Sequence, residues 1–138
     1  MKKFLLLLLT AISSVALGGE PWRLTLQDKA NGLRLCLDLY EESIEVPGME
    51  MFGPMNGYMN GKGLYGVWSV TSYDIKNDRE ALVRMSNDLG SDTQEIEVKA
   101  LTDSTYQVDL VKGVSMKKVV GGKKLQKIDS RYVMEVVN

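Results

Sequence analysis

The sequence contains no histidine and only one cysteine among its 138 residues. Without histidine, the chain cannot build a Ser-His-Asp triad, a Cys-His nucleophile or an imidazole site for zinc or haem. A single cysteine, Cys36, excludes an intramolecular disulfide and every cluster that needs several thiolates. With 17 basic and 18 acidic side chains, the net charge of −1 gives no electrostatic reason to expect a nucleic-acid partner. We therefore expect a protein that is not an enzyme and that carries no metal and no cofactor.

Residues 1–18 have the pattern of a signal peptide. Lys2 and Lys3 precede an apolar stretch, and Ala16-Leu17-Gly18 offers a cleavage site of the small-x-small type. The apolar stretch is too short for a confident membrane span, and no cysteine near residue 18 supports a lipoprotein anchor. These features predict a secreted or periplasmic protein that consists of residues 19–138, without a stable membrane span after cleavage.

Strict alternation of apolar and polar residues dominates the chain after residue 20. Between Gly32 and Tyr40, four leucines recur at every second position, separated by residues such as Arg34 and Asp38. Such spacing places the leucines on one face of a β-strand, whereas in a helix they would point in several directions. Asn31-Gly32, just before this run, is a typical hairpin turn because both residues tolerate a positive φ. Cys36 then falls among the polar residues, where we expect a half-buried thiol without a chemical role.

Further short runs with the same alternation are separated by turn residues. The predicted strands are 22–26, 32–40, 67–75, 81–85, 96–100, 106–110, 116–120, 123–128 and 132–137. Connections of only a few residues are typical of an antiparallel meander, here of roughly eight to ten strands. Closing the sheet into a small up-and-down barrel would remove its unpaired edges. The all-β barrel is therefore our fold prediction, with a β-sandwich as the alternative.

A signal peptide followed by hairpin-linked strands resembles the calycin group, which includes the lipocalins and the fatty-acid-binding proteins. Lipocalins carry Gly-x-Trp near the start of their first strand, with an arginine from a late strand packed over the tryptophan. The only Gly-x-Trp here is Gly66-Val67-Trp68 in mid-chain, while Trp22, near the expected position, has Glu20 two residues before it. Arg131 is the arginine that could cover Trp22. The resemblance implies a lipocalin-like barrel that binds a small apolar or amphipathic ligand without covalent chemistry.

The segment 49–59 is rich in methionine and is interrupted by glycine, proline and asparagine. An apolar segment with so little regular structure is expected to cap the core or to cover a barrel mouth, where flexible thioethers suit an adaptable contact. In a ligand-binding barrel, aromatic and methionine side chains would hold the ligand, and Arg84 could meet a carboxylate. The predicted ligand-binding residues are Met55, Tyr58, Met59, Tyr65, Trp68 and Arg84. The alternative is a solid barrel that docks onto another envelope protein through 49–59.

Three further motifs have two interpretations each. Gly61 to Gly66 matches G-x-G-x-x-G, but the β-branched residues that follow do not favour the helix that a dinucleotide site needs, so we expect a glycine-rich hairpin. The oxygen-rich stretch 86–95 is compatible with calcium or with an ordinary metal-free hairpin loop. Lysines on both sides of Gly121-Gly122 predict a basic hairpin end, which either contacts an anionic surface or serves solubility and protection of the sheet edge. Because carboxylates are plentiful, a two-carboxylate glycosidase remains a third possibility.

Overall fold

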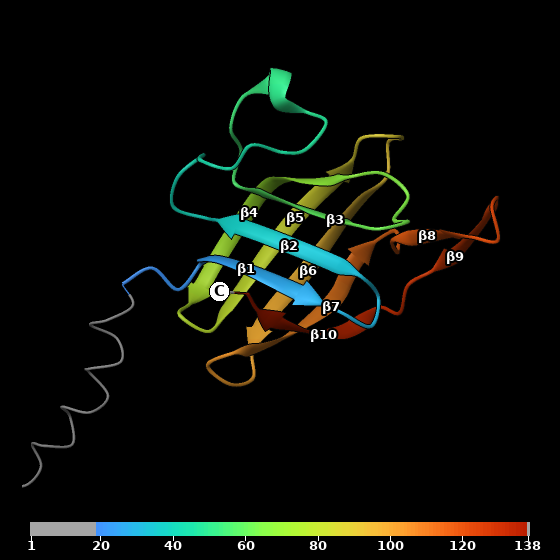
Figure 1. Ribbon diagram of the computed structural model, residues 1–138. Helices are drawn as coiled ribbons and strands as arrows, with labels where there is room; N and C mark the ends of the chain where they lie inside the picture. Colours follow the sequence, from blue (N-terminus) through green and yellow to red (C-terminus); the bar gives the residue numbers. More distant parts are fainter. Residues whose placement is uncertain (1–18, 138) are drawn as a thin grey trace, which may run out of the picture.

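The computed structural model describes residues 19–137, so the predicted signal peptide lies outside the described residues. This part of the chain forms ten β-strands and one short 3-10 helix, and it contains no α-helix (Figure 1). The elements are β1 Arg23–Asp28, β2 Leu33–Asp38, η1 Glu50–Phe52, β3 Gly57–Gly61, β4 Trp68–Asn77, β5 Glu80–Asn87, β6 Thr93–Ala100, β7 Thr105–Gly113, β8 Lys117–Val120, β9 Lys124–Lys127 and β10 Arg131–Val136. Within 19–137, no helix has the length and apolar character needed to cross a membrane.

Eight of the ten strands close into an antiparallel barrel. Strands β1 to β7 follow one another around the sheet, and β10 lies between β7 and β1 to complete the ring. Strands β8 and β9 pair only with each other and form a separate hairpin between β7 and β10. The prediction of an up-and-down barrel is therefore confirmed, with one hairpin inserted outside the ring.

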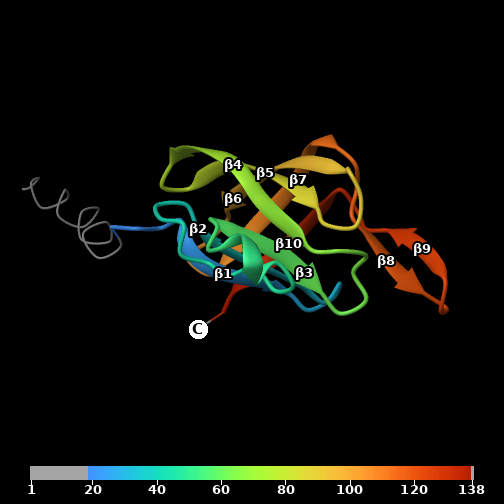
Figure 2. The ribbon, with the colours of Figure 1, turned by 90° about the horizontal axis from the view of Figure 1, so that it is seen from above.

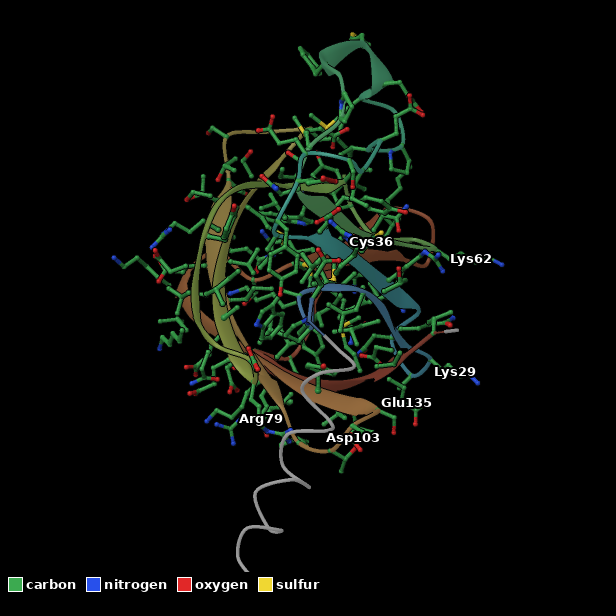
Figure 3. The ribbon with its side chains drawn as sticks, turned by 90° about the vertical axis from the view of Figure 1, so that its left-hand side faces the viewer. Lys29, Cys36, Lys62, Arg79, Asp103 and Glu135 are labelled. Carbon is green, nitrogen blue, oxygen red and sulfur yellow. The ribbon has the colours of Figure 1, made fainter. Side chains whose placement is uncertain are left out.

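The two ends of the barrel differ in what covers them. We call one end the hairpin end, because it carries the turns 29–32, 62–67 and 88–92 and the segment 114–130 with the β8–β9 hairpin. In Figures 1 and 2 this hairpin projects beyond the ring of strands. The opposite end, the termini end, carries the segment 39–56, the short turns around Arg79 and Asp103, and both ends of the described chain. Figure 3 looks onto the termini end, where Arg79 and Asp103 mark those turns.

The interior of the barrel is a packed hydrophobic core. The four leucines predicted to share one face, Leu33, Leu35, Leu37 and Leu39, are each at most 2% exposed. Along β5 and β6, buried and half-buried residues alternate in the same way. Because the sheet closes on itself, the inward-facing side chains of its strands converge on the centre of the barrel. The leucine face therefore occupies much of the interior.

Strand β3 was not predicted from the sequence, because it is rich in glycine and asparagine. The prediction that the segment 49–59 lacks regular structure is wrong for its last residues, because Gly57–Gly61 pairs with β2 on one side and with β4 on the other. Glycine is needed there for close approach, since a Cβ at Gly57 would lie 2.2 Å from the carbonyl oxygen of Cys36. The predicted glycine-rich hairpin at 61–66 is confirmed as the connection between β3 and β4.

Trp22 plugs the termini end of the barrel. Its side chain is fully buried, its Nε1–H donates to the carbonyl oxygen of Asn77 at 2.8 Å, and its ring packs edge-on against Tyr106. Arg131 does not cover it, which corrects the arrangement implied by the lipocalin resemblance. Arg131 begins β10 at the hairpin end, where its Nε donates to Asp109 at 2.6 Å. The direction of β10 therefore separates these two side chains by the length of the barrel.

Candidate ligand-binding site

Three buried polar side chains lack a hydrogen-bond partner. They are Trp68, Gln94 and Tyr132, whose Nε1, Nε2 and hydroxyl groups are enclosed without a donor or acceptor nearby; among the described residues these are the only such groups. The three residues are 2%, 4% and 8% exposed. Buried polar groups in native proteins are nearly always paired, so an unpaired group indicates a missing partner such as a water molecule or a ligand.

All three side chains lie on the inner face of the barrel and at its hairpin end. Trp68 is the first residue of β4, and Gln94 and Tyr132 are the second residues of β6 and β10. Trp68 pairs opposite the core residue Met59, and Gln94 and Tyr132 alternate with buried apolar residues along their own strands. The same end and the same face therefore carry three unpartnered groups from three different strands.

Apolar side chains close the hairpin end above these groups. Met116 and Ile128, which flank the β8–β9 hairpin, are 3% and 6% exposed and belong to the main core. Leu64, from the β3–β4 connection, packs partly buried against the same core. A backbone hydrogen bond from Ile128 to Met116 holds the base of the hairpin together. The mouth at this end is thus covered by the segment 114–130, and the Met-rich segment is not its cover.

The electrostatics of the site keep its groups as hydrogen-bond donors. Burial raises the pKa of Tyr132 well above its ordinary value, and the negative charge of Asp28 raises it further, so its hydroxyl stays protonated. The indole Nε1 can only donate, and the amide Nε2 carries two hydrogens. Asp28 itself is buried and accepts hydrogen bonds from the backbone of Ala30 and Asn31, which tightens the turn between β1 and β2. The site therefore suits acceptor atoms such as carbonyl, ester or hydroxyl oxygens.

Three of the six predicted ligand-binding residues lie near this site. Trp68 belongs to it, Met59 is fully buried beside Trp68 in the cross-strand pair between β3 and β4, and Tyr65 lies in the connection before β4. Tyr65 is 40% exposed, and its backbone N–H donates to the carbonyl oxygen of Lys117, which links the connection to the hairpin. The binding role of these residues stays a prediction.

The other three predicted residues lie outside the barrel interior. Tyr58 is half-buried on the outer face, where it pairs opposite Cys36, and Met55 forms an isolated bridge with Ile44 in the segment before β3. Arg84 is on the outer face of β5, as its alternation with buried Val83 and Met85 predicts. A ligand held inside the barrel therefore cannot touch all six residues.

Arg84 is already paired with two carboxylates. Its guanidinium group contacts Asp74 at 2.6 Å and Glu95 at 3.3 Å, and it also donates to the hydroxyl of Ser72. The hydrogen bond to Asp74 is the main cause that raises the pKa of Arg84, so the group stays charged. A depression of about 300 Å³ between β4 and β7 is bordered by Arg84, Glu95 and Lys112, and also by Gln94. Arg84 is therefore neutralised by its own carboxylate partners, whereas Lys112, which also borders the depression, forms no ion pair among the described residues.

Gln94, Tyr132 and Asp28 were missed by the sequence analysis, although a signal for Gln94 and Tyr132 exists. Gln94 stands at a position where the alternation of β6 requires an inner residue, two before Ile96. Tyr132 occupies the corresponding position two before Met134 in β10. A polar residue in the apolar phase of a strand is the pattern to look for. Whether such a residue has a partner depends on the neighbouring strands, which the pattern does not specify.

The oxygen-rich stretch 86–95 serves to tie two connections together. Asn87 donates through Nδ2 to the carbonyl oxygen of Tyr65 at 2.9 Å and accepts from the backbone of Leu89, while Asp88 accepts from the backbone of Val67. In the described part of the chain, no three acidic or cysteine side chains come together as a group that could hold a metal ion. The side-chain oxygens of Asn87 and Asp88 thus accept hydrogen bonds from backbone N–H groups in the connections at the hairpin end.

Comparison with models of protein families, with curated proteins and with solved structures found no match for this chain. Its closed eight-stranded antiparallel barrel is compatible with a lipocalin-like fold.

Proposed function

We propose that this is a secreted or periplasmic, non-catalytic binding protein that takes a small amphipathic ligand into the hairpin end of its barrel. The observation that carries this proposal is the set of unpartnered buried groups on Trp68, Gln94 and Tyr132. The apolar part of the ligand would lie among Met59, the leucines and Met116. Its oxygen atoms would accept hydrogen bonds from the three groups. On this proposal, the resemblance to the calycin group lies in the shape of the barrel and in the mode of ligand binding.

The energetics favour an occupant at this site. A buried donor without an acceptor costs about 1–3 kcal/mol, so three such groups represent a substantial part of the stability of a small domain. An eight-stranded barrel is just wide enough to hold one small ligand beside its own side chains. Because the leucine face already fills much of the interior, the ligand must be small and must sit near the mouth.

Native mass spectrometry of the protein recovered from the cells that produce it tests this proposal. We expect a bound organic molecule that solvent extraction removes. Gln94→Leu and Tyr132→Phe each remove one donor and should weaken rebinding of the extracted molecule about tenfold, which corresponds to about 1.4 kcal/mol. Gln27→Leu is the matched control, because Gln27 is a half-buried glutamine on the outer side of β1. This control should bind as the wild type does.

Two results would contradict the proposal. One is that the protein from its native source has the mass of the polypeptide alone, and that a crystal structure shows ordered water molecules hydrogen-bonded to Trp68, Gln94 and Tyr132. The other is a bound molecule whose affinity is unchanged by Gln94→Leu and Tyr132→Phe. In the first case the three groups are hydrated core residues, and in the second the ligand lies elsewhere.

A second candidate function is docking onto another envelope protein through the Met-rich segment. Met51 and Phe52 are 80% and 66% exposed on η1, which stands away from the barrel at the top of Figure 1. Glu50 in this segment and Glu45 just before it are exposed, so a partner with an apolar pocket and a basic rim is the complementary surface. Met51→Ser with Phe52→Ser should abolish binding of such a partner. Leu89→Ser with Leu101→Ser, which changes two other exposed residues, should leave it intact.

A further inference from the structure

The β8–β9 hairpin is attached to the barrel through one edge of β8 and through the residues that flank the hairpin. Lys118 Nζ donates to the carbonyl oxygen of Asn31, and Met116 and Ile128 anchor the two strands in the core. Along one edge of β8, a bridge joins Lys118 to Leu64, the N–H of Val119 donates to Gly63, and Lys117 accepts from the N–H of Tyr65. Beyond these contacts β8 and β9 pair only with each other, and β9 is exposed along its whole length. Figures 1 and 2 show from two directions that the hairpin extends past the end of the barrel. It therefore presents a free surface to the surroundings.

One face of the hairpin combines two apolar residues with lysines. The cross-strand pairs Lys117–Lys127 and Val119–Leu125 alternate with Lys118–Gln126 and Val120–Lys124. Since directly opposite residues share a face, Val119 and Leu125 lie on the same face as Lys117 and Lys127. Lys118 on the other face reaches Asn31, so the face with Val119 and Leu125 is turned away from the barrel. These two apolar side chains are 40% and 48% exposed.

The charge of the hairpin is unbalanced. Residues 117–127 hold five lysines and no acidic residue, so they carry a charge of +5, whereas the rest of 19–137 has ten basic and eighteen acidic side chains, a net of −8. The ion pairs within the described chain involve Arg23, Lys76, Arg84, Lys99 and Arg131, and none involves a lysine of the hairpin. Lys117 even lies directly opposite Lys127, where like charges repel. An external anionic partner would remove this repulsion.

We propose that this hairpin face docks onto the surface of an anionic phospholipid bilayer. Lysines near such a surface are attracted to its negative potential, with an effect of about fivefold on binding for each residue. Val119 and Leu125 would enter the interface between headgroups and acyl chains. Because the barrel carries the opposite charge, an anionic surface repels the barrel and attracts the hairpin, which orients the molecule with the hairpin towards the lipid. Nucleic acid fits less well, since the hairpin has no arginine or aromatic residue and exposes an apolar pair. The proposal does not depend on a ligand inside the barrel.

Vesicle co-sedimentation of the chain from Gly19 onward, which holds every described strand, tests the proposal. We expect binding to vesicles of equal parts phosphatidylglycerol and phosphatidylcholine, little binding to pure phosphatidylcholine, and a decline of binding with added salt. Replacing the exposed lysines 123, 124 and 127 by glutamine should weaken binding at least tenfold. The matched control is Lys76→Gln with Arg79→Gln and Lys99→Gln, which removes the same charge from the termini end and should keep binding.

The apolar pair separates a bilayer from other polyanions. Val119→Ser with Leu125→Ser should weaken vesicle binding several-fold, whereas Val111→Ser with Val133→Ser, at exposed positions on the barrel wall, should not. Circular dichroism of each variant verifies that the barrel is intact. The proposal is overturned if the wild type does not bind anionic vesicles, or if both triple variants lose binding equally. It is also overturned if heparin or duplex DNA binds as tightly as the vesicles and the serine variants have no effect.

Discussion

The two tryptophans of the chain occupy opposite ends of the same barrel and differ in one respect. Trp22 at the termini end and Trp68 at the hairpin end are both almost fully buried, at 0% and 2% exposure. The Nε1–H of Trp22 donates to Asn77, whereas that of Trp68 has no partner. Equal burial with unequal hydrogen bonding distinguishes the two ends: the described part of the chain supplies an acceptor for the indole at the termini end and none for the indole at the hairpin end. The following predictions test this difference.

The largest expected effect is the loss of the plug at the termini end. Trp22→Ala should lower the free energy of unfolding by about 3–5 kcal/mol, because it opens a cavity and removes a hydrogen bond. Trp68→Ala removes a similar volume together with an unpartnered N–H, so its cost should be smaller by about 1 kcal/mol. Urea denaturation of both variants measures the difference. An equal or larger loss for Trp68→Ala would mean that the hairpin end is as complete as the termini end.

A smaller change in the free energy of unfolding, of opposite sign, is expected when Gln94 is replaced. In the ligand-free protein, Gln94→Leu should raise the free energy of unfolding by about 1–3 kcal/mol, because it replaces an unpartnered amide in the core by an apolar group of similar size. Gln107→Leu is the contrasting variant, since the Nε2 of Gln107 donates to Asp109 at 3.0 Å and its loss brings no such gain. Thermal and urea denaturation give the two values. A destabilised Gln94→Leu would show that this amide has a partner in solution.

The third prediction concerns the loss of folding stability in acid, which we expect to arise mainly at the termini end. Burial alone would raise the pKa of Asp38, but hydrogen bonds from the Ser43 hydroxyl, from the backbone of Tyr40 and Glu41 and from Arg23 outweigh it and hold the pKa below its ordinary value. A carboxylate with a lowered pKa in the folded state contributes stability above about pH 4, and this contribution is lost as the pH falls through the folded value. The free energy of unfolding, measured by urea denaturation at several pH values, should therefore decline below about pH 4.

The variants Asp38→Asn and Asp109→Asn compare the two ends directly. Asp38→Asn should flatten the decline in acid. Asp109→Asn should flatten it less, although the hydrogen bond from Arg131 also lowers the pKa of Asp109. The side chain of Asp109 is 20% exposed against 3% for Asp38, so solvent screens its ion pair more strongly. A larger change for Asp109→Asn would assign the acid sensitivity to the wall near the hairpin end.

Most strands could be predicted from the sequence because their signals are local. The alternation between Leu33 and Leu39 specifies which residues face inward, and turn residues such as Asn31-Gly32 mark where the chain reverses. Strand β3 gave no such signal, because its glycines and asparagines are typical of turns. It forms since β2 and β4 offer it partners on both sides and since the missing Cβ of Gly57 allows their backbones to come close. Local preference is overridden there by pairing between distant segments.

The candidate site was only partly predictable, for a related reason. Trp68 and Met59 were identified by their residue types, but Tyr58 is also aromatic and faces outward because it alternates with Met59. The residue types of Gln94 and Tyr132 suggested no role, and they matter only because their strands bring them to the same end of the barrel. Whether a buried polar group finds a partner depends on the positions of several strands at once.

The amino-acid sequence by itself therefore determined the class of fold, the inward face of the leucine strand and the chemistry that is excluded by the lack of histidine. Alternation and turn residues act over a few positions, so they can be recognised without any knowledge of the tertiary structure. Only the tertiary structure decided that β8 and β9 stand outside the ring, that Trp22 closes one end and that three polar groups remain unpaired at the other. These properties depend on burial and on strand register between distant segments, which arise when the barrel closes.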